Sequence, residues 1–357
     1  MRVLIAAGGT GGHIYPGIAI ANEIVGRDAS SEVLFVGTSR GLESKLVPEN
    51  GFRLSIIHSA GLKNVGIKGK ITGLAVLPRS FIESRRLIKE FQPDVVVGAG
   101  GYVSGPVLMT ASLMRIKTLI MDSNALPGFT NRRLASFVDR AALTFKEALP
   151  FFGKKGVVTG NPVRKVFFDI RPKTREQKLN LLIFGGSQGS KAINDALVEG
   201  LKDMESFRAE LRIVHQTGEA EVESVKKGYA DKGWIDADIR PYISAMVDEF
   251  AKADMIICRA GATSCAELAA AGRASIMVPL PTAADDHQRK NAEAMQSAGA
   301  ALMILQGALN GKRLATEIEG FLRSPQRITE MEINARKLAR EDAAEATVDI
   351  IEELALR

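Results

Sequence analysis

Cysteine and aromatic residues are scarce in this chain of 357 residues. Its two cysteines, Cys258 and Cys265, cannot build a disulfide framework, and their spacing matches no zinc-ligand pattern. Such low cysteine use is typical of a reducing compartment. Aromatic residues make up 6% of the chain, with a single tryptophan, which argues against a nucleic-acid binder that stacks bases on aromatic side chains.

Long apolar runs and a large excess of one charge are also missing. No window approaches the roughly 20 apolar residues that span a bilayer, and the N-terminus enters a predicted strand directly, so neither a transmembrane helix nor a signal peptide is expected. The 47 basic and 41 acidic residues leave a net charge of +6, which fits either ordinary solubility or attraction to an anionic partner. The length suits two domains better than one.

Strand and helix signals alternate along the chain and start again near its middle. The strands predicted for the first half are 3–7, 32–37, 54–58, 94–98, 118–122, 142–144 and 156–159. Those predicted for the second half are 180–184, 212–216, 238–241, 255–258, 274–278 and 301–304. Helical patterns lie between most of them, so the sequence predicts an α/β protein with two doubly wound parallel-sheet domains. Residues 325–357 have a helical pattern throughout; the end of this stretch is expected either to cross back onto the first domain or to pack only on its own.

A glycine-rich turn follows the first predicted strand of each half. Residues 8–13 read Gly-Gly-Thr-Gly-Gly-His, and residues 185–190 read Gly-Gly-Ser-Gln-Gly-Ser. A strand, tight turn and helix in this order direct backbone N–H groups at an anion. The first turn does not fit a dinucleotide fingerprint, because the last position counted from Gly9 is Ile14 and the next strand lacks the acidic residue that binds a ribose.

Three further segments carry polar or glycine-rich turns after predicted strands. Residues 98–106 hold four glycines, which indicate either a tight junction or, together with the turn at 8–13, an anion pocket. Residues 258–267 open a helix whose first-turn amides suit a diphosphate, and Glu267 is placed to accept hydrogen bonds from a ribose diol. Residues 279–291 form a polar loop of the kind that lines sugar sites.

Four of these motifs occur together and in order: 8–13, 185–189, Arg259 to Ala262 with Glu267, and Asp286-His287-Gln288 with Asn291. A fifth, Gly-Asn-Pro-Val-Arg at 160–164, lies between the first two. In them the chain resembles, over essentially its whole length, the MurG family within glycosyltransferase family 28. The resemblance implies an inverting transferase that moves N-acetylglucosamine from UDP-N-acetylglucosamine to the C4 hydroxyl of undecaprenyl-diphosphate-linked N-acetylmuramoyl-pentapeptide (lipid I to lipid II) in peptidoglycan synthesis.

The resemblance also implies the GT-B architecture, in which two Rossmann-like domains face an interdomain cleft. Residues 1–162 would form the acceptor and membrane-binding domain, joined by a terminal helix at about 341–357 if that helix crosses back. Residues 163–340 would bind UDP-N-acetylglucosamine.

Residue roles follow from the matching family positions. Uracil would lie near Ile243 and Met246, the ribose on Glu267, the diphosphate on Ser187 and the turn from Ala262 to Ala266, and the sugar on Gln288 and Asn291. The full set implied for the donor is Thr10, Gly11, Gly12, Asn124, Arg164, Ser187, Ile243, Met246, Ala262, Thr263, Ser264, Cys265, Ala266, Glu267, Gln288 and Asn291. The set implied for the acceptor diphosphate is Gly11, Gly12, His13, Gly100, Gly101 and Tyr102.

Two residues are candidates for the general base. His13 is the first, because histidine titrates near neutral pH, although it also suits a role as a hydrogen-bond partner of a hydroxyl or phosphate. Asp122 is the second. There the chain departs from its relatives, with Met-Asp-Ser-Asn at 121–124 in place of the family's His-Glu-Gln-Asn, which weakens a catalytic role for this strand end.

No metal cofactor is expected. Asp236-Ala237-Asp238 spells a D-x-D triplet but falls at a strand entry, and a helix N-terminus already provides diphosphate stabilisation. Residues 68–89 form a basic amphipathic stretch that Pro78 interrupts, so it is predicted as a turn followed by a helix. This stretch is a candidate membrane face, and the alternative is a helix that faces the core. The residues that would contact the membrane are Ile71, Leu74, Leu77, Phe81 and Arg85. The implied location is peripheral, on the cytoplasmic face of the plasma membrane, with other cell-wall synthesis proteins as further candidate partners.

The sequence is also compatible with two other function classes. A UDP-N-acetylglucosamine 2-epimerase of the same fold needs carboxylates around the sugar and no lipid-binding face. A nonenzymatic sugar-nucleotide or membrane-docking protein would dispense with His13 and Glu267.

Overall fold

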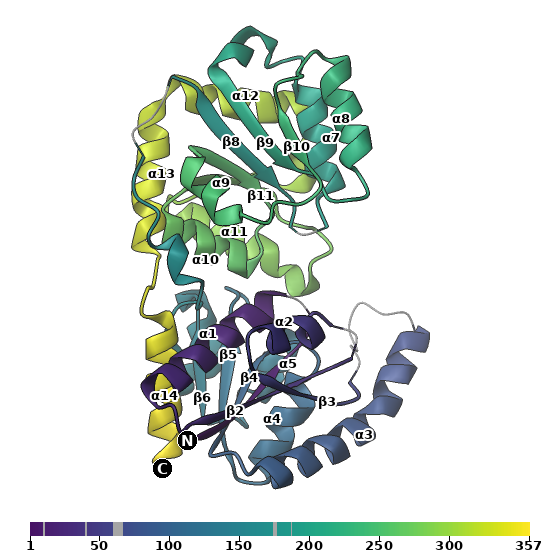
Figure 1. Cartoon of the computed structure of the whole chain (residues 1–357), viewed down its shortest axis with the longest axis vertical. Helices are drawn as coiled ribbons and strands as arrows, with labels where there is room; N and C mark the ends of the chain where they lie inside the picture. Colours follow the sequence, from purple (N-terminus) through teal and green to yellow (C-terminus); the bar gives the residue numbers. More distant parts are fainter. Residues whose placement is uncertain (10, 40, 60–66, 174–176, 187) are drawn as a thin grey trace. The chain divides into compact units, whose positions relative to one another are not determined.

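The computed structural model describes residues 1–9, 11–39, 41–59, 67–173, 177–186 and 188–357, and for 67–75 it describes the backbone alone. The chain divides into two compact units, Met1–Val163 with Arg340–Arg357 and Arg164–Ala339. Each unit has its own parallel sheet with helices on it (Figure 1). The predicted α/β class with two doubly wound domains is confirmed.

The sheet of the first unit has seven parallel strands in the order β3-β2-β1-β4-β5-β6-β7. The strands are β1 Arg2–Ala7, β2 Glu32–Gly37, β3 Arg53–Ile56, β4 Val95–Gly100, β5 Lys117–Asp122, β6 Arg140–Leu143 and β7 Gly156–Val158. The helices are α1 Gly11–Arg27, α2 Glu43–Glu49, α3 Ile67–Phe91, α4 Ser104–Leu113, α5 Phe129–Leu134, α6 Leu149–Phe152 and α14 Ala343–Ala355. Every residue of β4, and every residue of β1 after Arg2, is buried, as their continuous apolar sequences predict.

Alternate residues of β1 face two different apolar layers. Val3 and Ile5 pack in a cluster with residues of α1 and α14, and Leu4 packs in a second cluster with residues of α3 and α4. Figure 1 shows α1 (purple) and α14 (yellow) side by side, and Arg27 of α1 binds Asp349 of α14 at 2.7 Å. The last helix of the chain therefore belongs to the core of the first unit.

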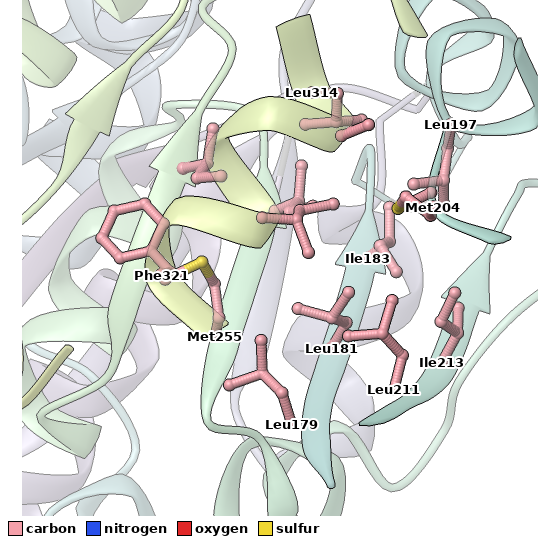
Figure 2. Packing of buried hydrophobic residues seen from close by; sticks show 14 of the residues in the cluster. Leu179, Leu181, Ile183, Leu197, Met204, Leu211, Ile213, Met255, Leu314 and Phe321 are labelled. Atoms are coloured by element: carbon pink, nitrogen blue, oxygen red, sulfur yellow. The ribbon is translucent and has the colours of Figure 1, made fainter. Parts of the chain in front are cut away.

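The sheet of the second unit has six parallel strands in the order β10-β9-β8-β11-β12-β13. The strands are β8 Leu179–Phe184, β9 Leu211–Gln216, β10 Asp238–Arg240, β11 Met255–Cys258, β12 Ala274–Met277 and β13 Leu302–Met303. The helices are α7 Lys191–Gly200, α8 Val222–Asp231, α9 Met246–Lys252, α10 Ala262–Ala271, α11 His287–Ser297, α12 Gly311–Arg323 and α13 Pro325–Lys337. Figure 2 shows the core on one face of this sheet, where Leu314 and Phe321 of α12 lie over Leu181, Ile183 and Met255.

Two helix predictions were wrong. Helix α3 runs without a break through Pro78, which was expected to interrupt it; because Pro78 is exposed, water can solvate the carbonyl group that loses its partner to the proline ring. The terminal stretch 325–357 is two helices, since residues 338–342 separate α13 from α14. The chain leaves the second unit and enters the first within this break.

The strand order of both sheets reverses at a corresponding place, while all strands stay parallel. The order reverses between β1 and β4 in the first sheet and between β8 and β11 in the second. Ligands of open α/β sheets bind outside the carboxyl ends of the strands at such a switch point. The four strands at the two switch points are those that the glycine-rich turns follow.

Candidate functional site

The two glycine-rich turns of the first unit are in direct contact. A Cβ atom on Gly101, whose φ is +82°, would lie 2.2 Å from the carbonyl oxygen of Gly8. A Cβ atom on Gly100, whose φ is +119°, would lie 2.4 Å from Cδ2 of His13. Only glycine fits both the backbone conformation and the space at these two positions. The turns after β1 and β4 therefore form one structure, and His13 lies in it.

His13 lies in the first turn of α1, which begins at Gly11. Its Nδ1 is 3.2 Å from the carbonyl oxygen of Gly8. Because a carbonyl oxygen can only accept a hydrogen bond, this contact requires the proton on Nδ1, and the neutral ring then carries its lone pair on Nε2. The positive end of the α1 dipole also favours the neutral ring, so the geometry suits a base that acts through Nε2.

Asp122, the second candidate base, is engaged in holding the turn that follows β5. Its carboxylate accepts hydrogen bonds from the backbone N–H groups of Asn124 and Gly128, each at 3.0 Å, and from Asn131 Nδ2 at 2.8 Å. The side chain is buried, and burial raises the pKa of Asp122 against the lowering effect of these bonds and of His13. Asn124 is held beside it by the same turn.

Glu43, at the start of α2, is a polar residue of this region that the sequence did not single out. It is fully buried, and its carboxylate accepts hydrogen bonds from the backbone N–H of Gly9 at 2.9 Å and from the N–H and hydroxyl of Thr38, both at 2.8 Å. Burial favours a higher pKa, but these hydrogen bonds hold the pKa of Glu43 below its ordinary value. The only sequence feature that could have indicated this site is the pair of glycines at 37 and 41, where a Cβ atom would collide with Glu43.

The remaining residues predicted for the acceptor lie at the same end of the sheet. Gly11 and Gly12 form the first turn of α1, with N–H groups that have no partner within the helix. Tyr102 follows Gly101, and its side chain is 60% exposed. Thr10, between Gly9 and Gly11, lies outside the described residues.

The second unit has a pocket of about 360 Å³ at its own switch point. It is lined by the turn after β8, the turn after β11 and the start of α11, through Gly185, Gly186, Gly189, Ser190, Lys191, Arg259, Gly261, Ser264, Leu280 and Gln288. Three segments that the sequence marked separately therefore meet. Ser187, predicted for the diphosphate, lies outside the described residues.

Two cations of this pocket were missing from the predicted site. Arg259 is fixed by hydrogen bonds to the carbonyl oxygens of Val278 and Pro279 and, at 2.8 Å, to Gln306 Oε1. Lys191 opens α7 and is exposed, with Asp195 at 3.1 Å. Arg259 directly follows β11 and stands in one of the family motifs, but neither it nor Lys191 has a sequence pattern that separates a ligand contact from a solvated charge.

The start of α10, whose Gly261 and Ser264 line this pocket, has polar groups without intrahelical partners. Gly261 caps the helix without a side-chain hydrogen bond, so the first-turn N–H groups at Ala262, Thr263 and Ser264 lack intrahelical partners. The hydroxyl of Thr263 is buried and has no hydrogen-bond partner among the residues that the structure describes. Cys265 is buried, which raises the pKa of its thiol to about 12, so this residue offers its backbone and no reactive sulfur.

Glu267 lies one turn further along α10, next to Ala266. Its side chain is 16% exposed, and Arg164 Nη2 lies 3.4 Å from Oε1. Burial raises the pKa of Glu267 to about 7, although Arg164 acts in the opposite direction. The guanidinium of Arg164 also lies 4.8 Å from the ring centre of Phe167, which holds it in place. A carboxylate so placed can accept two hydrogen bonds from a diol.

Gln288 and Asn291 have different environments on α11. Gln288 lines the pocket, and its Oε1 accepts a hydrogen bond from the backbone N–H of Leu280 at 3.0 Å. Asn291 is fully buried and donates through Nδ2 to the carbonyl oxygen of Ala260 at 3.2 Å. Asn291 therefore contributes to holding the turn before α10.

Gln216, at the end of β9, joins the pocket to the segment predicted for uracil. Its Nε2 donates to the carbonyl oxygen of Gly186 at 2.9 Å, and its Oε1 accepts from the backbone N–H of Ile243 at 2.8 Å. Gln216 and Ile243 are both buried, and Met246 opens α9 just beyond. One side chain thus fixes the spacing between the glycine turn and this segment, and it already occupies the N–H of Ile243.

The candidate membrane residues lie on α3. Ile71 and Leu74 belong to its backbone, but their side chains lie outside the described residues. Leu77 and Phe81 are half-buried and Arg85 is exposed. Ile88, on the same helix, is buried in the core of the first unit. In the part of the chain that the structure describes, no helix is both long and apolar enough to cross a membrane.

The two aspartates of the D-x-D triplet are each paired with an arginine. Asp236 is exposed and lies 3.5 Å from Arg208, and Asp238 pairs with Arg240. Within the described ranges, no group of three or more His, Cys, Asp or Glu side chains is placed to hold a metal ion.

Both halves of the chain match domains of the same glycosyltransferase family. Residues 3–143 match the glycosyltransferase family 28 N-terminal domain, and residues 180–348 match the family 28 C-terminal domain. A relative from Syntrophus aciditrophicus (strain SB) is 47% identical over 98% of this chain and 97% of its own length. It is named UDP-N-acetylglucosamine--N-acetylmuramyl-(pentapeptide) pyrophosphoryl-undecaprenol N-acetylglucosamine transferase.

Solved structures agree with the sequence relatives. The crystal structure of MurG from Acinetobacter baumannii has a TM-score of 0.81 and 33% identity, with 99% of both chains covered. A UDP-GlcNAc 2-epimerase from Neisseria meningitidis, bound to UDP-GlcNAc, has a TM-score of 0.71 at 13% identity over 99% of this chain and 100% of its own, which shows a shared fold alone. Together with the matches over nearly its full length, these findings show that the chain is a glycosyltransferase of the GT-B fold and belongs to the MurG family within glycosyltransferase family 28.

Proposed function

We propose that this enzyme transfers N-acetylglucosamine from UDP-N-acetylglucosamine to the C4 hydroxyl of undecaprenyl-diphosphate-linked N-acetylmuramoyl-pentapeptide, with inversion at the anomeric carbon. The name of the Syntrophus relative supports both substrates. The observation that carries the proposal is the pocket of the second unit, where a glycine turn, an uncapped helix start and two cations come together around about 360 Å³.

The second unit binds the donor in this proposal. The N–H groups at the start of α10, the hydroxyl of Thr263 and the cations Arg259 and Lys191 suit a diphosphate without a metal ion. Glu267 takes the ribose, and Gln288 takes the sugar hydroxyls. Uracil lies against Ile243 and Met246 and uses the carbonyl oxygen of Ile243, because the N–H of Ile243 already donates to Gln216.

The first unit binds the acceptor, with the N–H groups of Gly11 and Gly12 and the turn at Gly100 to Tyr102 on its diphosphate. His13 Nε2 removes the proton of the C4 hydroxyl. That oxygen forms a bond to the anomeric carbon while the bond from this carbon to the phosphate oxygen breaks, and UDP leaves with both electrons of that bond. Asp122 holds the turn that carries Asn124 and takes no proton.

An acceptor with a polyprenyl tail requires access to a membrane. The basic helix α3 is the proposed contact, through Ile71, Leu74, Leu77, Phe81 and Arg85, with the enzyme peripheral on the cytoplasmic face. The test is co-sedimentation with vesicles containing anionic lipid. Changing Leu77 and Phe81 to Ser is expected to lower the bound fraction, and unchanged binding would place the contact elsewhere.

The epimerase alternative has weaker support, because the UDP-N-acetylglucosamine 2-epimerase structures share the fold at 10% to 14% identity, while the transferase relatives are 44% to 47% identical. Incubation with UDP-N-acetylglucosamine, with and without the lipid acceptor, separates the two. Release of UDP only with acceptor supports the transferase. Conversion of the donor without acceptor would indicate the epimerase, and binding without turnover would indicate a nonenzymatic protein.

The role of His13 has its own test. His13→Ala is expected to lower kcat by about 100-fold or more, the usual contribution of a general base, while the donor Kd changes little. A variant with unchanged kcat would rule His13 out as the base.

A further inference from the structure

One peptide group connects Glu43 with His13. The N–H of Gly9 donates to Glu43 Oε2 at 2.9 Å, and the carbonyl oxygen of Gly8 lies 3.2 Å from His13 Nδ1. These two groups belong to the same planar peptide unit, the bond between Gly8 and Gly9. The carboxylate of Glu43 therefore accepts a hydrogen bond from the N–H of this peptide, and the C=O of the same peptide accepts one from the Nδ1–H of His13.

We propose that Glu43 is a positioning residue for catalysis, which acts on His13 through the Gly8–Gly9 peptide. This inference rests on the proposed role of His13 as the base. A negative charge on the N–H side of a peptide increases the partial negative charge on its oxygen, and hydrogen bonds in such a chain strengthen one another. The Gly8 carbonyl thus becomes a stronger acceptor for Nδ1–H, which keeps the lone pair on Nε2 and stabilises the imidazolium that forms when Nε2 takes the acceptor proton.

The surroundings of Glu43 fit this role better than a role in packing alone. A fully buried carboxylate is costly unless its charge is compensated, and an apolar side chain would fill the same space more cheaply. Here Oε1 accepts two hydrogen bonds from Thr38, and Oε2 is left for the N–H of Gly9. The carboxylate is held on the peptide that contacts His13.

The geometry on the His13 side is equally restricted. The ring packs against Gly100, and the Gly8 oxygen packs against Gly101, where a Cβ atom would collide with each. A second carboxylate, Asp122 at the end of β5, also acts on His13 by its charge. It is kept in every variant below, so changes among them report on Glu43.

The test compares Glu43→Gln with two matched controls. Glu49→Gln removes the same charge from the exposed other end of α2, and Thr38→Val removes one hydrogen bond from Glu43 while keeping its charge. The first measurement is the tautomer of His13 by ¹⁵N NMR in the ligand-free enzyme. The chain has four histidines, so the signal that disappears in His13→Ala identifies the residue.

In the wild type and both controls we expect the proton on Nδ1. In Glu43→Gln we expect a substantial fraction of the His13 rings to carry the proton on Nε2. We expect kcat to fall about tenfold, while the donor KM stays within about twofold of the wild-type value. The acid limb of the pH profile of kcat should move to lower pH. The shift is downward because loss of the negative charge destabilises the imidazolium, so the ring stays deprotonated to lower pH.

An unchanged tautomer and acid limb in Glu43→Gln would overturn the inference, and so would an equal response in Thr38→Val. If Glu43→Gln does not fold, Glu43→Asp replaces it, since it keeps the charge but withdraws the carboxylate from Gly9, and the same tautomer loss is expected. The outcomes distinguish the two hypotheses. Full activity of His13→Ala refutes the role of His13 as the base, whereas a normal His13 tautomer in Glu43→Gln refutes only the positioning role of Glu43.

Discussion

Donor affinity is expected to depend on pH through Glu267, and the size of the effect follows from its burial. The pKa of Glu267 is raised from an ordinary value of 4.5 to about 7 because the side chain is buried, with Arg164 only partly offsetting the effect. Ribose hydroxyl groups donate hydrogen bonds, so the ionised carboxylate is the form that binds both of them.

The expected magnitude is about tenfold. With a pKa near 7, roughly nine-tenths of Glu267 is ionised at pH 8 and roughly one-tenth at pH 6, so Kd should rise about tenfold over these two units. Titration calorimetry with UDP-N-acetylglucosamine measures this directly. The intact sugar nucleotide is the right ligand, because free UDP carries a terminal phosphate that itself titrates near pH 6.

The raised pKa of Glu267 also predicts that the stability of the folded chain changes with pH in the opposite direction to donor affinity. Because the pKa is higher in the folded chain than in the unfolded one, the folded state holds an extra proton between pH 4.5 and about 7. The associated stability is fully present below pH 4.5 and is lost as pH rises through this window, to a total of at most about 3.4 kcal/mol.

Glu267→Gln separates these two effects. The variant should bind the donor more weakly at pH 8, without the pH dependence of the wild type, and yet unfold at a higher denaturant concentration at pH 8 than the wild type does. Its loss of Arg164 as a partner matters little, since the arginine is half-exposed. A flat wild-type Kd between pH 6 and 8, or a variant that keeps the pH dependence, would refute the reasoning.

Three further predictions concern the glycine turns, the bridge that the Gln216 side chain makes between Gly186 and Ile243, and the metal. Gly101→Ala should destabilise the first unit by about 2 kcal/mol or more in thermal unfolding, because φ is +82° and the Gly8 oxygen blocks the Cβ atom. Gly26→Ala has open space around it and should not destabilise the unit; equal effects of the two changes would contradict the packing argument. Gln216→Met should weaken UDP binding in calorimetry about tenfold, because it frees the glycine turn from the segment at Ile243, and an unchanged Kd would show that the bridge is not needed. Turnover should survive EDTA, and a loss that Mg²⁺ restores would show that a metal takes part.

The sequence predicted the fold and the end of each sheet where the glycine-rich turns gather, because both depend on local signals. Strand 32–37 and strand 255–258 match the observed β2 and β11 residue for residue, since apolar β-branched runs bounded by turn residues leave little ambiguity. Residues 185–190 and 258–267 were identified as separate segments, and they meet only because β8 and β11 are neighbours at the switch point.

Features that depend on contacts far apart in the chain were not predicted. Glu43 lies 34 residues from Gly9, and Gln216 lies 30 residues from Gly186, so neither pairing leaves a periodic or local pattern. The break between α13 and α14 was missed for a similar reason: it follows from the return of the chain to the first unit, while the residues on either side favour a helix.

Mass spectrometry of the lipid-linked acceptor after incubation with UDP-N-acetylglucosamine tests the central claim most directly. We expect the wild type to add the mass of one N-acetylhexosamine to the muramoyl-pentapeptide carrier, and His13→Ala to add almost none at the same donor occupancy. An unmodified acceptor with wild-type enzyme, or full transfer by His13→Ala, would contradict the proposed reaction.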